Sequence, residues 1–197
     1  MFLENTINHS KQSGWMEVIC GSMFSGKTEE LIRRLRRAEM AGQNVEIFKP
    51  KLDTRYSEED VISHNQNKIR STPVENPNEI LLLASNCDVI GIDEAQFFDQ
   101  GIVDVANQLA NSGIRVVIAG LDMDFLGRPF GPMPNLMATA EYVTKVHAIC
   151  KRTGNLANYS MRISQGNNLV ELGETESYEA VSRRVFIDEV LSKKKNS

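Results

Sequence analysis

The chain has 197 residues, of which 41% are hydrophobic and 24% are charged, a profile typical of a globular protein with room for one α/β domain and a small appended lobe. Its formal net charge of −4 leaves no basic excess to neutralise nucleic-acid phosphates, and no apolar stretch is long enough to cross a bilayer. A dedicated nucleic-acid binder and a membrane protein are therefore disfavoured, although a local basic groove stays open.

The amino-terminal stretch, residues 1–14, is predicted to be a polar tail. Glu4 and several amides stand where a signal peptide would need a positive end and an apolar run. The three cysteines, Cys20, Cys87 and Cys150, are widely spaced and odd in number, which argues against a disulfide framework. These features lead us to expect a cytoplasmic protein.

Strands alternate with helices from residue 15 to residue 122. Apolar runs predict the strands, and apolar residues at helical spacing predict the helices. The expected order is strand 15–20, helix 27–43, strand 45–50, polar loop or lid 51–78, short helix 79–85, strand 87–93, helix 99–113 and strand 115–122. This alternation predicts a parallel sheet that is covered by helices on both faces.

The pattern changes after about Thr144 to short strands or turns. They are expected at 145–150, 155–163 and 167–173, with a closing helix at 186–195. We therefore divide the chain into a core at 15–146, a smaller lobe at 147–192 and a basic tail at 193–197.

A phosphate-binding motif lies where the first strand meets the first helix. Glycines allow such a loop to fold tightly, so that successive N–H groups face one anion, and the helix N-terminus adds positive charge. Lys27 can bridge the β- and γ-phosphates, and Thr28 can offer its hydroxyl to Mg²⁺. Four fixed positions can arise by chance, but the strand before and the helix after are the context that the motif requires. The residues that fit G-x-x-x-x-G-K-[ST] are Gly21, Ser22, Met23, Phe24, Ser25, Gly26, Lys27 and Thr28.

Two acidic residues follow the strand at 87–93. The run VIGIDE ends in Asp93 and Glu94, and the strand end leaves both carboxylates free to face a cleft. Asp93 suits Mg²⁺, through a water molecule, and Glu94 suits a general base beside the γ-phosphate. The alternative is a pair of loop acids that cap the next helix. These features indicate a nucleoside triphosphatase or a kinase, without choosing between attack by water and attack by another hydroxyl.

Five motifs in series make the interpretation more specific. They are GSMFSGKT, KPKLDTRY, DEAQFF, GLDMDFLGRPFGPM and ESYEA. In this order and over residues 15–186, the chain resembles thymidine kinases of the bacterial and cellular cytosolic type. The resemblance implies a P-loop, RecA-like α/β fold with a small C-terminal lasso lobe. It also implies transfer of the γ-phosphoryl group of ATP to the 5′-hydroxyl of thymidine, which gives thymidine monophosphate.

The resemblance assigns roles at the phosphate end of the site. Glu94 matches the family's general base, and Lys27 matches its phosphate contact. Asp53 and Arg55 match a pair near the metal and the phosphates, although by themselves they could form an acid–arginine pair that stabilises a turn. Arg162 is a further candidate to offset charge on the transferring group. The expected ATP site comprises the phosphate loop with Asp93, Glu94, Ala95 and Gln96, and the expected Mg²⁺ site comprises Thr28, Asp93 and Asp53.

A thymidine pocket under the lasso is also implied. By composition alone, Met and Phe at such places are more often ordinary core residues. The lasso matches residues Ser160 to Gly173 and is expected to close over the base mainly with main-chain groups. Glu171 stands where the lasso usually has an apolar residue, a change that main-chain contacts would tolerate. The positions that match the pocket lining are Met23, Phe97, Leu121, Phe125, Phe130 and Tyr178.

The lasso lobe departs from the family in its cysteines. Where two C-x-x-C pairs normally bind zinc, this chain has CKRT, with Cys150 and Thr153, and SRRV, with Ser182 and Val185. His147 could join Cys150 in a two-ligand remnant, but no other Cys or His nearby in sequence completes a tetrahedron, so we expect no structural zinc. The hypothesis is that packing holds the lobe instead. The candidates for that packing are Ile149, Leu156, Val181, Val185 and Phe186.

Two other functions remain open at this point. A motor or remodelling ATPase would explain the phosphate loop and the acids equally well, but it would not require the aromatic series at 97, 125 and 130. A regulatory module that has lost catalysis would also fit, although intact Lys27 and Glu94 weigh against it. On the kinase interpretation the partners are thymidine and ATP, with no nucleic acid and no membrane. The family is commonly tetrameric, so the resemblance implies a homotetramer.

Overall fold

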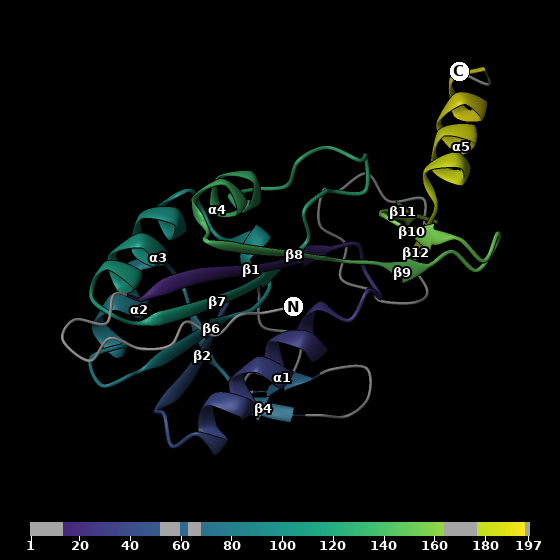
Figure 1. The fold of residues 1–197 in the computed structure, drawn as a ribbon. Helices are drawn as coiled ribbons and strands as arrows, with labels where there is room; N and C mark the ends of the chain where they lie inside the picture. Colours follow the sequence, from purple (N-terminus) through teal and green to yellow (C-terminus); the bar gives the residue numbers. More distant parts are fainter. Residues whose placement is uncertain (1–13, 52–59, 63–67, 164–176, 196–197) are drawn as a thin grey trace.

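A computed structural model of the protein describes residues 14–51, 60–62, 68–163 and 177–195. Its main body is a sheet between helices, and a small lobe of short strands lies beyond one end of that sheet (Figure 1). The elements are β1 (Trp15–Gly21), α1 (Lys27–Met40), β2 (Val45–Pro50), β3 (Asp60–Ile62), β4 (Lys68–Arg70), β5 (Thr72–Val74), α2 (Asn78–Leu83), β6 (Val89–Ile92), η1 (Ala95–Phe97), α3 (Gly101–Asn111), β7 (Arg115–Gly120), α4 (Met133–Thr139), β8 (Tyr142–Val146), β9 (Ala148–Ile149), β10 (Leu156–Ala157), β11 (Tyr159–Arg162), β12 (Tyr178–Val181) and α5 (Arg183–Lys195).

Six strands form one sheet in the order β5-β2-β6-β7-β1-β8, and every neighbouring pair is parallel. β7 lies between β1, which leads into the phosphate loop, and β6, which ends at the acidic pair. Because all the strands run the same way, their carboxyl ends meet at one edge of the sheet. The predicted parallel α/β fold is confirmed, and the topology brings both motifs to that edge.

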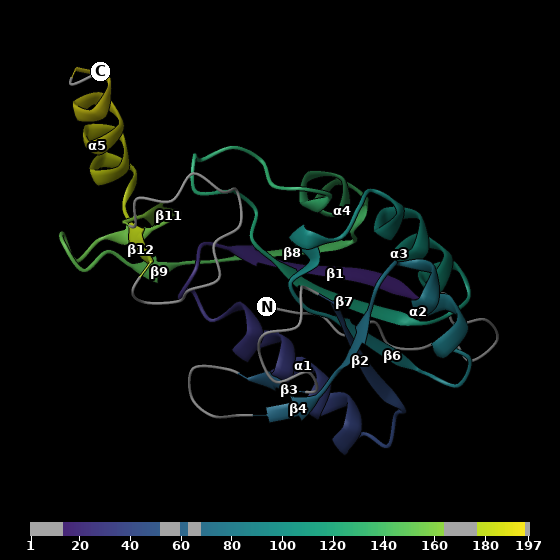
Figure 2. The same cartoon turned by 180° about the vertical axis from the view of Figure 1, so that it is seen from behind.

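Helices cover both faces of the sheet. α1 packs on one face, where its Leu31 and Leu35 join a cluster with Ile47 and Val117, while α2, α3 and α4 cover the other (Figures 1 and 2). The strands β6 and β7 therefore bury apolar side chains on both sides, which explains their continuous apolar runs. No helix in the part of the chain that the structure describes is long and apolar enough to span a bilayer.

One acidic side chain is buried on the α1 face of this sheet. Glu17 accepts hydrogen bonds from Arg34 and Arg115 at 2.7 Å each and from the indole of Trp15 at 2.8 Å. Burial alone would raise the pKa of Glu17, but these donors and positive charges lower it below its usual value. The network joins β1, α1 and β7, so it fixes the strand that carries the phosphate loop.

Several elements differ from the sequence-based expectation. The stretch at 51–78, predicted to be a loop, contains the hairpin β3–β4 and the edge strand β5, which pairs with β2. α4 was not predicted, because Pro132 and Pro134 at its start are residues typical of turns. β8 extends the main sheet by pairing with β1 and contains Lys145 and Val146, which we had expected in one short strand with residues 147–150.

The described part of the lobe has two short antiparallel pairs, β9–β10 and β11–β12, followed by α5, which points away from the sheet (Figure 1). Val181 and Phe186 are buried in its core and Val185 packs against it, as predicted. Ile149 and Leu156 were wrongly predicted: they are 59% and 57% exposed, because they pair across β9–β10 on the outer face. α5 begins at Arg183, three residues before the predicted closing helix at 186–195, and ends with it at Lys195. The core cluster comprises Ala148, Cys150, Ala157, Tyr159, Met161, Ala180, Val181 and Phe186.

Candidate active site

The phosphate loop connects β1 to α1 with backbone angles that require glycine. Gly21 has φ 149°, and a Cβ there would lie 2.2 Å from the carbonyl oxygen of Val146 on β8. Gly26 has φ 83° and immediately precedes the first residue of α1. The Ser25 hydroxyl donates to the Ser22 carbonyl at 2.7 Å and closes the turn. Strand, turn and helix N-terminus thus have the arrangement that a phosphate-binding loop needs.

Lys27 reaches back over this loop. Its Nζ donates to the Ser22 carbonyl oxygen at 2.8 Å. Burial lowers the pKa of Lys27, while the carboxylates of Glu94, Asp93 and Asp122 act in the opposite direction. The ammonium group therefore sits at the loop among acidic groups, on a neutral acceptor that a phosphate oxygen could replace.

Asp93 and Thr28 meet across β6 and α1. The Thr28 hydroxyl donates to one carboxylate oxygen of Asp93 at 3.3 Å, and the main-chain N–H of Glu94 donates to the other at 3.0 Å. Burial, and then the negative charge of Glu94, raise the pKa of Asp93 to about 7. A buried carboxylate beside a hydroxyl is an oxygen donor set that suits Mg²⁺.

Glu94 begins the short helix η1 from an unusual backbone position. Its φ of 52° is in the left-handed region, which a residue with a Cβ adopts only at some cost. Its side chain is half-buried and accepts a hydrogen bond from the amide of Gln96. Because of this left-handed conformation, the chain changes direction at Glu94, just after β6 and Asp93.

Four of the six residues expected to line a nucleoside pocket take part in two contacts. Phe97 and Phe130 meet edge to face, with ring centroids 5.6 Å apart and an interplanar angle of 85°. In the second contact, the guanidinium carbon of Arg162 lies 4.0 Å from the ring centroid of Phe125, and Nη2 of Arg162 donates to the hydroxyl of Tyr178 at 2.7 Å. The first contact joins η1 to the segment between β7 and α4, and the second joins that same segment to the lobe.

The lobe binds the phosphate loop directly, which sequence reasoning missed. The Ser22 hydroxyl donates to the carbonyl oxygen of Ala157 at 3.2 Å. The N–H of Met23 donates to the Ser160 hydroxyl at 2.9 Å, so the buried Ser160 side chain is engaged by the loop. No local pattern could have indicated these contacts, because the partners lie more than a hundred residues apart in the sequence.

A second missed feature is the ion pair between Lys145 and Asp122, whose Nζ and Oδ2 are 2.6 Å apart. It joins the end of β7 to β8, on either side of β1. Asp122 is buried, and its charge reaches Lys27. A salt bridge between two strand ends has no sequence spacing that would reveal it.

Four residues named from the sequence, Asp53, Arg55, Glu171 and Gly173, lie outside the described residues.

The two former cysteine pairs come together in the lobe. The Cys150 side chain is buried, and burial alone would raise the pKa of its thiol. Hydrogen bonds from the Thr153 hydroxyl and from main-chain N–H groups, including that of Ser182, outweigh this effect and lower the pKa to about 7. His147 is exposed. Within the described ranges, no group of three His, Cys, Asp or Glu side chains could hold a metal ion.

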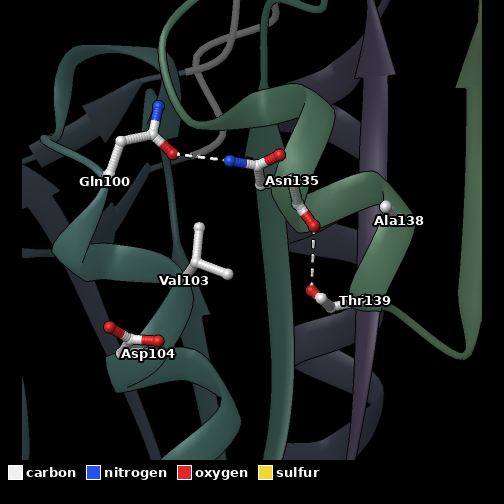
Figure 3. A pocket seen from close by; sticks show the side chains of 6 residues that line it. All are labelled: Gln100, Val103, Asp104, Asn135, Ala138 and Thr139. Atoms are coloured by element: carbon white, nitrogen blue, oxygen red, sulfur yellow. Dashed lines mark hydrogen bonds between the residues drawn. The ribbon is translucent and has the colours of Figure 1, made fainter.

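A separate groove of about 400 Å³ lies between α3 and α4 (Figure 3). A hydrogen bond of 2.8 Å from the Asn135 amide to Gln100 crosses it. None of its lining residues belongs to the phosphate loop, to the acidic pair or to the aromatic contacts. They are Gln100, Val103, Asp104, Asn135, Ala138 and Thr139.

The parallel sheet, the glycine-bounded loop with Lys27 and the buried acid at the end of β6 together define a nucleotide-binding protein of the P-loop class. Comparison with known proteins refines this class. The thymidine kinase family model matches residues 14–186. The chain belongs to the thymidine kinase family and is therefore an ATP-dependent nucleoside kinase.

Individual relatives agree over nearly the whole chain. A thymidine kinase of Bacteroides thetaiotaomicron is 59% identical and covers 95% of this chain and 94% of its own length. One of Porphyromonas gingivalis is 61% identical, with 93% and 90% covered, and one of a Rhodothermus species is 60% identical, with 91% and 84% covered. Among solved structures, the genome packaging NTPase B204 from Sulfolobus turreted icosahedral virus 2 superposes with a TM-score of 0.47 at 15% identity, over 72% of this chain and 78% of that chain, too weakly to bear on function.

Proposed function

We propose that the protein transfers the γ-phosphoryl group of ATP to the 5′-hydroxyl of thymidine, with Glu94 as the base that accepts the hydroxyl proton. Family membership supports the two substrates. The observation that carries the site assignment is the meeting of Lys27, Thr28 and Asp93 with Glu94 at one sheet edge, where Thr28 and Asp93 are hydrogen-bonded. A motor ATPase and a regulatory module have no comparable support.

Mg²⁺ is proposed to lie between the triphosphate, Thr28 and Asp93. The hydroxyl and carboxylate are hard oxygen ligands, and a cation beside Asp93 would relieve the cost of ionising that buried group. When bound, Mg²⁺ neutralises charge that develops on the β- and γ-phosphates. Asp53 is proposed as a further contributor on the strength of the resemblance.

The residues around the loop can stabilise the transfer of the phosphoryl group. Lys27 would exchange the Ser22 carbonyl for a phosphate oxygen, a stronger acceptor because it is charged. Glu94 would take the proton while the 5′-oxygen attacks in line. Arg55 and Arg162 are proposed to offset charge on the transferring group.

Thymidine is proposed to bind between the sheet and the lobe. The walls would be the Phe97–Phe130 contact with Met23 and Leu121 on one side, and Phe125 with Tyr178 on the other. The lasso from Ser160 to Gly173 would close the pocket with main-chain groups and exclude water, which would otherwise compete as the nucleophile. On this proposal, the core at 15–146 holds ATP and the lobe at 147–192 completes the nucleoside site.

A label-transfer assay tests the proposal. With γ-labelled ATP and thymidine, the protein should produce labelled thymidine monophosphate, whereas an ATPase would give only free phosphate. Glu94→Gln should lower kcat by at least about a hundredfold with an unchanged fold, because the amide cannot accept the proton. Glu39→Gln, on the exposed face of α1, is the matched control. A Glu94→Gln variant of near-native rate would remove Glu94 from this role.

Three coarser expectations accompany this function. The resemblance supports a homotetramer, which the molar mass in solution would test. The acidic net charge of −4 supports small-molecule substrates without a nucleic-acid partner. Cysteines without a disulfide framework support a cytoplasmic location.

A further inference from the structure

Gln96 has a side chain that is 2% exposed and yet lies two residues from the proposed base. The resemblance groups Gln96 with the ATP-binding residues. In the structure, however, its amide is engaged at both ends by the protein itself. Nε2 donates to the carboxylate of Glu94, and Oε1 accepts from the main-chain N–H of Leu121 at 2.9 Å.

The chemistry of the two partners fixes the orientation of this amide. A main-chain N–H can only donate and a carboxylate can only accept, so the reversed amide would face two mismatched partners. Glutamine alone among the common side chains offers a donor and an acceptor at this length. The Glu94 carboxylate is thereby tied to the main chain just after β7, at a residue proposed to line the nucleoside pocket.

Two glycines leave the space that Gln96 occupies. A Cβ on Gly120 would lie 2.9 Å from Oε1 of Gln96, and a Cβ on Gly131 would lie 2.3 Å from the Gln96 carbonyl oxygen. Both glycines belong to the motif GLDMDFLGRPFGPM, so part of that motif serves to admit Gln96. The close approach of Gly120 restricts the Gln96 amide, and that of Gly131 restricts the Gln96 main chain.

We infer that Gln96 is a positioning residue, which holds the Glu94 carboxylate in the orientation for proton transfer and links it to the wall of the nucleoside pocket. The inference rests on the proposed role of Glu94. Glu94 leaves the strand in a left-handed conformation and is only half-buried, so little besides Gln96 restricts its side chain among the described contacts. A base that is free to rotate would spend less time in the reactive geometry.

Replacing Gln96 tests this inference. Gln96→Met keeps the shape and removes both hydrogen bonds, and Gln96→Glu keeps an acceptor for Leu121 but cannot donate to Glu94 when ionised. Both variants should lower kcat roughly ten- to a hundredfold, the worth of a hydrogen bond to a charged group, with little change in KM for ATP. Gln96→Glu carries the test if Gln96→Met does not fold.

The matched control is Gln100→Met. Gln100 also uses both ends of its amide, to the Gly131 carbonyl at 3.1 Å and to Asn135 at 2.8 Å, but it lies in the groove between α3 and α4 (Figure 3). It should leave kcat unchanged. If Gln100→Met lowers kcat as much as Gln96→Met does, the effect is one of general packing and the inference is overturned.

A double-mutant cycle separates this inference from the proposed function. In a Glu94→Gln background there is no base to orient, so Gln96→Met should lower the residual rate less than threefold, well short of its effect in the native protein. A full, additive loss in that background would overturn the positioning role while leaving Glu94 as the base. A native rate for Glu94→Gln alone would instead overturn the proposed function.

Discussion

The six-stranded sheet and the C-terminal lobe are stabilised in different ways. The sheet has apolar clusters on both faces and a buried network in which Glu17 joins β1 to α1 and β7. In the described residues of the lobe, one cluster of eight buried residues, three of them alanine, lies between pairs of strands two to four residues long. Its described cluster is smaller than either cluster of the sheet and contains fewer large aliphatic side chains, so the lobe should open at a lower free energy than the sheet.

The two regions meet at the phosphate loop. Ser22 and Met23 are hydrogen-bonded to Ala157 and Ser160 of the lobe, while the glycine ends of the loop are fixed by the sheet and α1. The sheet thus carries the phosphate loop, and the lobe, which we expect to be less stable, contacts that loop and contains Tyr178. This division is what a closing lobe requires, because segments that move come from the less stable parts of a protein.

The largest loss of stability is expected at Glu17, the acidic side chain that is buried against the sheet. Glu17→Leu should destabilise the protein by about 3–5 kcal/mol, because it leaves Arg34 and Arg115 without their shared acceptor. Arg33→Leu, at an exposed position outside this network, removes a surface ion pair and should cost at most about 1 kcal/mol. Since the folded pKa of Glu17 is below 4.5, its contribution is present above that pH and is lost as the pH falls. Urea unfolding at pH 7 and pH 4 would measure both; equal costs for the two variants would contradict the prediction.

Removing the loop cation should affect rate rather than folding. Lys27→Met should lower kcat by roughly 10²–10³, the loss typical for a donor that stabilises transition-state charge. Lys151→Met, at an exposed lysine of the lobe, should have no effect on the rate. Steady-state kinetics with a melting curve for each variant would show whether activity falls while the fold remains. Comparable kinetics for Lys27→Met and the native protein would rule out a phosphate contact.

Asp93 should make the nucleotide-free protein less stable at neutral pH. Its folded pKa of about 7 is above the usual value of 3.8. The stability due to the protonated form is therefore complete below pH 3.8 and is lost as the pH rises through 7, by up to about 1.4 kcal/mol per pH unit in this window. Asp93→Asn should remove this slope and, at pH 8, match or exceed the stability of the native protein while losing activity. Parallel pH–stability curves for the two proteins would show that burial of Asp93 has no such cost.

The sequence predicts the sheet well because each central element carries its own signal. The apolar run VIGI at β6 and the glycine-bounded loop before α1 are local patterns with local physical causes, and both are confirmed. Thr72–Val74 and Met133–Thr139 have no such pattern. Both contain proline, which is typical of turns, and what stabilises them is pairing with β2 and packing on the face of the sheet that α2 and α3 cover.

The residues of the candidate site likewise fall into those with a local sequence pattern and those without one. The motifs indicate Lys27, Asp93 and Glu94 by their positions in the sequence. The amide of Gln96 on Leu121 and the hydroxyl of Ser160 on Met23 depend on how distant segments come together. Two exposed residues of the lobe were wrongly predicted to be core for a related reason: alternation along a two-residue strand is too short to show which face is buried.

A milder substitution should lower the stability of the lobe without changing that of the sheet. The rings of Tyr159 and Phe186 stack with centroids 4.4 Å apart. Phe186→Leu should cost the lobe roughly 0.5–1.5 kcal/mol, because it removes that stacking. Limited proteolysis should cut the lobe faster and KM for thymidine should rise, while the main unfolding transition stays in place. Ile187→Ala, at an exposed neighbour, is the control. A shift of the main transition for Phe186→Leu would show that lobe and sheet unfold together.

The smallest effect is expected from chelation. A structural zinc site contributes on the order of 10 kcal/mol, so a zinc-dependent lobe would unfold in excess EDTA. Here the Thr153 hydroxyl and the Ser182 N–H already donate to the Cys150 thiol, in place of the bonds that a metal would make. The melting temperature without nucleotide should therefore not change on chelation. As a positive control, combining Thr153→Cys, Ser182→Cys and Val185→Cys should create zinc binding and a chelator-sensitive lobe, because two of these positions already contact Cys150. Near-stoichiometric zinc in the native protein would contradict the prediction, since it would require metal ligands beyond the single cysteine of this cluster.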